Sequence, residues 1–252
     1  MIYGLTPVQA SMKFFSRLNQ IEINALLQLG IKVLSQEKDG AFLIKMGQHT
    51  FTTKSETALQ PGREYWVDLH QSREGIVYLK RLLPKPLLLT QLTQPLFDGK
   101  FLEELPHKKE PAGAFKEYLL QALASASNKE QFQTLTQLLL ALHQGIFSLP
   151  IYQDGKKMLL QMRQRKKNKN LNQKSIEFYA AMNNIGPIEG KIVQFEDQCT
   201  LTLEVYYPKS VHLLQQHINS LKGFDHININ LSSAPIHPFW EGEQSGLLDI
   251  KG

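Results

Sequence analysis

A Gly-Pro turn within residues 184–192 constrains the fold of this chain more than any other feature. Gly186 supplies a permissive backbone, and Pro187 fixes its own φ near about −65°, so the turn leads directly into a strand. The hydrophobic pattern then changes from period two to helical spacing and back again. This predicts a strand, a second strand, a covering helix and a last strand, over residues 187–195, 198–207, 209–221 and 226–231.

The first third of the chain also has the pattern of β-structure, after a predicted helix that begins at Thr6-Pro7. Asp39-Gly40 and Pro61-Gly62 are strong turn signals between strand-like runs. Short strands at this spacing are typical of a small closed barrel of the oligonucleotide-binding type. The expected strands cover residues 31–34, 41–46, 49–53, 64–69 and 76–82.

The remaining pattern divides the chain into further parts. Residues 84–145 form a proline-rich connector with helices expected at 115–124 and 130–143. Residues 146–240 form a second domain, in which Asp154-Gly155 joins a hairpin and a strand covers 175–182. We therefore expect an α+β protein. It has a small β-barrel-like domain at 1–83, the helical connector, a C-terminal mixed β-sheet with one covering helix, and a tail at 241–252.

Composition is that of a globular protein, with 42% hydrophobic residues among 252. Cys199 is the single cysteine, so no internal disulfide forms, and we interpret it as a structural thiol on a strand. No apolar run reaches the roughly 20 residues of a membrane span, and no secretory signal pattern is visible. These observations favour a cytoplasmic protein without membrane insertion; export without a classical signal stays open.

A basic tract is the strongest charge feature of the chain. Between residues 156 and 174 there is no acidic residue. The tract fits contact with an acidic protein surface or with phosphate, or else an exposed hairpin end with incidental charge. Its cations are Lys156, Lys157, Arg163, Arg165, Lys166, Lys167, Lys169 and Lys174.

Nucleic-acid binding through the barrel and this tract is the alternative function. Aromatic residues do lie on the predicted strands of the barrel, for example Trp66 and Tyr78. Such aromatics are more often core than a stacking surface, and none is interleaved with the cations of the tract. Nucleic acid is therefore the less favoured partner.

No pattern in the chain indicates catalysis, a cofactor or a metal. His212 and His217 are five residues apart, so on a helix they point to different faces. Glu196-Asp197 lies at a turn between predicted strands, where short polar side chains satisfy local backbone groups. There is no phosphate-binding glycine motif and no nucleophile elbow. We expect a protein that is not an enzyme and has no small-molecule substrate.

The turn Ile185, Gly186, Pro187, Ile188 and Glu189, with the order of elements after it, resembles the C-terminal domain of bacterial flagellar hook-length control proteins. The resemblance covers about residues 149–233. It implies recognition of the cytoplasmic domain of the export-gate switch protein, with hook and hook-cap subunits as further partners. That contact changes the type III apparatus from exporting rod and hook subunits to exporting filament subunits.

The resemblance, together with the charge pattern, nominates partner-binding residues. The turn is expected to make the contact, and the basic tract to steer the approach electrostatically. The residues are Ile185, Gly186, Pro187, Ile188, Glu189, Arg163, Arg165, Lys166 and Lys167. One departure matters: members that measure hook length carry a long, low-complexity N-terminal half, whereas this N-terminal half has the pattern of folded structure.

Overall fold

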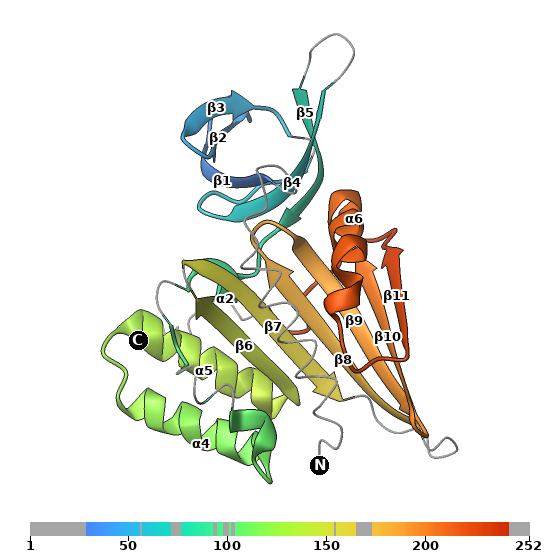
Figure 1. Cartoon of the computed structure of the whole chain (residues 1–252). Coiled ribbons are helices and arrows are strands. Elements are labelled where there is room, and N and C mark those ends of the chain that lie inside the picture. Colours follow the sequence, from blue (N-terminus) through green and yellow to red (C-terminus); the bar gives the residue numbers. More distant parts are fainter. Residues whose placement is uncertain are drawn as a thin grey trace.

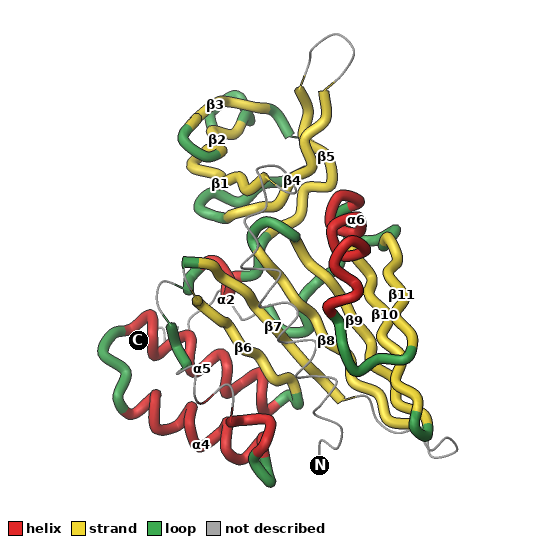
Figure 2. The backbone as a smooth tube through the Cα atoms, in the orientation of Figure 1, coloured by secondary structure: helices red, strands yellow, loops and turns green. Residues whose placement is uncertain are grey.

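The computed structural model describes residues 29–55, 57–71, 77–92, 95–97, 101, 104–153, 155–164 and 173–241. Within these residues, two sheets and four α-helices make an α+β architecture, in which both sheets are mostly antiparallel (Figure 1, Figure 2). The expected α+β class is confirmed. The predicted N-terminal helix and residues 242–252 of the tail lie outside the described residues.

The first sheet has the strand order β3-β2-β1-β4-β5, and every pairing in it is antiparallel. Gly40 adopts a φ of 82°, and Ala41 N donates to Asp39 Oδ1 at 3.1 Å, so the expected Asp-Gly turn joins β1 to β2. Ile31, Val33 and Ile44 form the centre of its small core. The strands are β1 (Leu29–Gln36), β2 (Phe42–Met46), β3 (His49–Thr53), β4 (Glu64–Gln71) and β5 (Val77–Pro84).

The closed barrel is the expectation that fails. Among the described residues β3 and β5 do not pair with each other, so the sheet curls but stays open. The reason lies in long-range packing. Trp66 on β4 and Leu83 on β5 are buried in the core of the second sheet, which draws these strands away from β3.

The middle of the chain packs on the second sheet. α2 (Leu87–Thr90) lies against β7, and η1 (Leu105–His107) precedes an antiparallel pair of helices, α4 (Pro111–Ala124) and α5 (Lys129–His143). Pro111 occupies the first turn of α4, and the Asn128 side chain caps α5 by accepting from Gln131 N at 2.8 Å. Gly145, with a φ of 77°, ends the segment before the next strand.

The second sheet has the order β11-β10-β9-β8-β7-β6, and only β10–β11 is parallel, so the expected mixed sheet is confirmed. The parallel step is possible because α6 (Pro208–His217) and η2 (Ile218–Ser220) carry the chain back along the sheet. The strands are β6 (Ile146–Gln153), β7 (Lys156–Gln164), β8 (Gln173–Met182), β9 (Gly186–Phe195), β10 (Gln198–Val205) and β11 (His226–Leu231).

Strand register gives this sheet two faces of opposite character. On the apolar face, one row across β6–β10 consists of Leu149, Leu160, Ala180, Ile188 and Val205. On the polar face, the neighbouring row consists of Ser148, Gln161, Tyr179, Glu189 and Glu204. The core cluster on the apolar face also includes Leu159, Tyr179 and Ala181, which are buried on the opposite face.

More than one helix covers the apolar face. α6 lies over β10 and β11, with Leu214 fully buried. Phe115 of α4 stacks on Phe147 of β6 with ring centroids 5.5 Å apart, so α4 and α5 share the same core (Figure 1). The expected single covering helix is therefore an underestimate. None of the described helices is long and apolar enough to cross a bilayer.

Replacing Gly190 by Ala should destabilise the protein. The Phe178 ring lies directly over Gly190 on the neighbouring strand, and a Cβ there would collide with it. Overpacking of this kind costs about 1–3 kcal/mol, which urea unfolding would measure. Gly113→Ala in α4 is the matched control, because its nearest neighbour is at an ordinary 3.7 Å and alanine favours a helix. Equal stabilities for the two variants would contradict the packing described.

Candidate functional site

The Gly-Pro turn is built into the fold. Gly186 has a φ of 84°, and a Cβ there would lie 2.6 Å from Cδ2 of Tyr207. The Ser210 hydroxyl donates to Ile185 O at 2.6 Å and so ties the first turn of α6 to the turn. Glycine is required at this position for two reasons: the backbone has a positive φ, and the Tyr207 ring approaches too closely for a side chain.

Most of the predicted contact residues on this turn are buried. The side chains of Ile185 and Ile188 are 1% and 0% exposed, and Gly186 and Pro187 are buried as well. Only Glu189 is partly exposed, on the polar face of the second sheet. Four of the five residues are therefore buried in the fold, and Glu189 is the one whose side chain reaches a surface.

Two described cations of the basic tract, Lys157 and Arg163, bond within the molecule. Nε and Nη2 of Arg163 both lie 2.9 Å from Glu177 Oε2, and the guanidinium lies 4.0 Å from the centre of the Phe239 ring. Lys157 Nζ donates to Thr90 O at 3.1 Å. Arg165, Lys166 and Lys167 lie outside the described residues, so their predicted role stays a prediction.

A C-terminal strap, residues 232–241, crosses the polar face of the second sheet. Gln161 is fully buried; its Nε2 donates to Trp240 O at 2.7 Å, and its Oε1 accepts from Trp240 N at 3.1 Å. Ile236 is buried, and the Phe239 ring lies 6.5 Å from that of Tyr179. Glu241 Oε1 is 2.8 Å from Arg63 Nη2, which connects the strap to the first sheet.

Sequence reasoning did not find this strap. Pro235 and Pro238 break any strand or helix period, so no element was expected after the strand at 226–231. The available signal was the spacing of Ile236, Phe239 and Trp240, which are large apolar residues in a segment without secondary structure.

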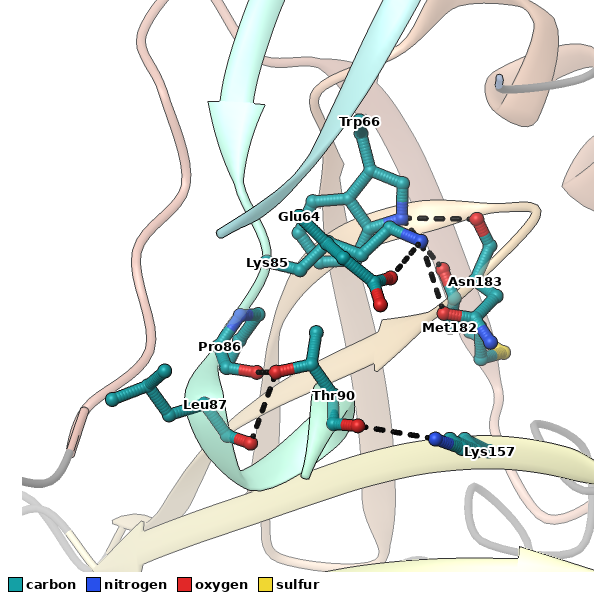
Figure 3. Close-up of polar contacts among 9 residues, drawn as sticks. All are labelled: Glu64, Trp66, Lys85, Pro86, Leu87, Thr90, Lys157, Met182 and Asn183. Atoms are coloured by element: carbon teal, nitrogen blue, oxygen red, sulfur yellow. Dashed lines mark hydrogen bonds and ion pairs between the residues drawn. The ribbon is translucent and has the colours of Figure 1, made fainter. Parts of the chain in front are cut away.

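The junction between the two sheets is a cluster of aromatic and polar side chains (Figure 3). The Trp66 indole N–H donates to Met182 O at 3.1 Å and to Asn183 O at 3.0 Å. Lys85 Nζ lies 3.4 Å from Glu64 Oε2, 3.2 Å from Asn183 Oδ1 and 5.9 Å from the centre of the Trp66 ring. Trp66 of β4 and Lys85, directly after β5, thus both bond to residues at the end of β8.

A second contact of the junction is reciprocal. Arg81 Nη1 donates to Tyr206 O at 2.6 Å, and the Tyr207 hydroxyl donates to Arg81 O at 2.8 Å. Arg81 has a φ of 50°, an uncommon conformation that costs a non-glycine residue of order 1–3 kcal/mol. The two hydrogen bonds hold this strained residue in place.

Burial shifts the pKa of several groups. Desolvation lowers the pKa of Lys85, and the carboxylate of Glu64 partly opposes it. Desolvation also raises the pKa of the Cys199 thiol, with a smaller contribution from Asp225. Cys199 is therefore a weak nucleophile, as a structural thiol would be.

In the described part of the chain, no three His, Cys, Asp or Glu side chains gather as metal ligands would. Comparison of the chain with protein-family models, curated proteins and solved structures finds no match in any of the three. The family resemblance thus rests on the residues of the turn and on the order of the elements around it.

Stability should fall above pH 10 because of two buried tyrosines. Desolvation raises the pKa of Tyr179 and of Tyr207 above the ordinary value of 10.0, so they stay protonated in the fold while the unfolded chain loses these protons. The unfolded chain then binds fewer protons, and the free energy of unfolding falls by about 1.4 kcal/mol per pH unit for each tyrosine. Lys85 changes the free energy of unfolding in the opposite direction, because its pKa is lowered in the fold. Its contribution stops growing above its unfolded pKa of 10.5.

Tyr207→Phe separates the two contributions. The substitution removes the hydrogen bond to Arg81 O, which should lower the free energy of unfolding by about 1 kcal/mol at neutral pH. It should also remove about half of the slope with which the free energy of unfolding falls above pH 10. Urea unfolding at neutral pH and above pH 10 measures both effects. An unchanged slope would show that Tyr207 ionises in the fold.

Gln161→Leu should release the strap. The substitution keeps the volume of the side chain but leaves Trp240 N and O without their partner, at a cost of about 1–3 kcal/mol. We expect lower stability and faster proteolysis within residues 232–241. Gln164→Leu is the control, because Gln164 is exposed at the end of the same strand. The geometry would be contradicted if both variants resisted proteolysis as the wild type does.

Proposed function

We propose that this chain is a recognition protein of the flagellar hook-length control type, which acts on the substrate specificity of the type III export apparatus. Its partner is the cytoplasmic domain of the export-gate switch protein. The observation that carries the proposal is the sequence of elements β8, Gly186-Pro187 turn, β9, β10, α6 and β11. This is the order that the resemblance implies for the C-terminal domain of that family.

The proposed contact lies on the polar face of the second sheet, around Glu189. Ile185, Gly186, Pro187 and Ile188 are buried, so they do not contact a partner in this proposal. Lys191 and Glu204 flank Glu189 on the same face, so the surface presents both signs of charge. The basic tract steers the approach, and hook or hook-cap subunits are secondary partners. The protein acts in the cytoplasm, with export through the apparatus as a further possibility of this proposal.

The proposal concerns switching and not the measurement of length. A ruler must be extended, with up to about 3.3–3.6 Å of span for each residue. Here the described residues between 29 and 145 form five strands and the helices α2, α4 and α5. Nucleic-acid binding, the alternative, gains no support from the described cations, since Lys157 and Arg163 bond within the molecule.

Deletion of the gene in the source bacterium tests the proposal. We expect overlong hooks without filaments in electron micrographs, and normal flagella when the wild-type gene is restored. Restoration with Glu189→Arg should fail or give longer hooks, because it reverses a charge at the proposed contact. Glu117→Arg, on the exposed surface of α4, is the matched control and should restore normal flagella. Normal hooks and filaments in the deletion strain would overturn the proposal.

A further inference from the structure

In the described part of the chain, β11 is an edge strand without the usual protection. Charged side chains, proline, bulges or a covering element keep the edges of natural sheets from pairing with other chains. β6, at the opposite edge, contains Pro150, and β5 in the first sheet carries Lys80 and Arg81 with a bulge beside them. β11 has the sequence HININL, with no Asp, Glu, Lys, Arg or Pro, and its register with β10 is unbroken over all six residues.

The outer side of β11 presents a regular row of backbone groups. Ser232 N donates to Val205 O, in register with the ladder, so the even-numbered residues of β11 direct their backbone N–H and C=O toward β10. Successive residues alternate, so Ile227, Ile229 and Leu231 direct theirs outward. No described residue pairs with this side of the strand, which lies at the border of the sheet in Figure 1.

The side chains of β11 also match a copy of themselves. An antiparallel pair centred on Ile229 would place Ile229 opposite its own copy and Ile227 opposite Leu231, all on the face that α6 covers. Asn228 and Asn230 would meet on the other face. Leu231 is 47% exposed although it continues the apolar row of the sheet, and this pairing would cover it. Since the strand carries no Asp, Glu, Lys or Arg, two copies with His226 neutral meet without charge repulsion.

We propose that β11 pairs antiparallel with β11 of a second copy of this chain, which joins the two second sheets across a two-fold axis at Ile229. The pairing is isologous, because each copy contributes the same strand. The three outward residues form narrow pairs in which N–H and C=O are exchanged in both directions. This inference does not rest on the proposed function.

Sedimentation of the purified protein over a wide concentration range tests the proposal. We expect a reversible dimer for the wild type and a monomer for Leu231→Lys, which sets a charge against the apolar Ile227 of the other copy. Leu120→Lys is the matched control, because Leu120 is 49% exposed on α4, by β6 and far from β11 (Figure 1). This variant should remain dimeric.

Hydrogen exchange gives a readout that needs no substitution. The amides of Ile227, Ile229 and Leu231 should exchange slowly in concentrated protein and rapidly on dilution, while those of Asn228 and Asn230 stay protected by β10. A wild type that remains monomeric at high concentration, or a dimer in which these three amides exchange rapidly, would overturn the proposal. Either result would leave the deletion experiment unaffected.

Discussion

The burial of Trp66 is the interaction on which the arrangement of this protein depends. Its indole lies at 0% exposure in the core of the second sheet, although β4 belongs to the first. The N–H group bonds to two carbonyls at the end of β8, immediately before the Gly186 turn. A buried indole N–H without an acceptor would cost about 1–3 kcal/mol, so burial of the ring and placement of the turn are linked. Burial of Trp66 also draws β4 toward the second sheet and away from β3, so the first sheet stays open.

The strap and the junction both connect the two sheets. At the junction, the Arg81 side chain donates to Tyr206 O, and the Tyr207 hydroxyl donates to Arg81 O. At the strap, Gln161 bonds to Trp240 while Glu241 reaches Arg63 beside β4. Both sets of contacts join residues more than 70 positions apart in the chain. The orientation of the sheets is thus set by a few specific polar bonds in addition to apolar burial.

The sequence pattern predicted those parts of the fold that depend on neighbouring residues. The strands around Gly186 and the mixed second sheet follow from period, turn chemistry and propensity. The open form of the first sheet could not be predicted, because it depends on where Trp66 is buried, and nothing near residue 66 shows that. The burial of Ile185 to Ile188, which were expected to contact a partner, could not be predicted either. A turn motif in the sequence does not reveal that Tyr207 and Ser210 will cover it.

The placement of the two tryptophans has a practical consequence for spectroscopy. The sequence contains only Trp66 and Trp240, and they lie in the junction and in the strap respectively. Intrinsic fluorescence therefore carries one natural reporter for each long-range contact that joins the sheets. With either tryptophan replaced by phenylalanine, the remaining emission follows a single contact. Opening of the strap and separation of the sheets then become distinguishable in solution without any added label.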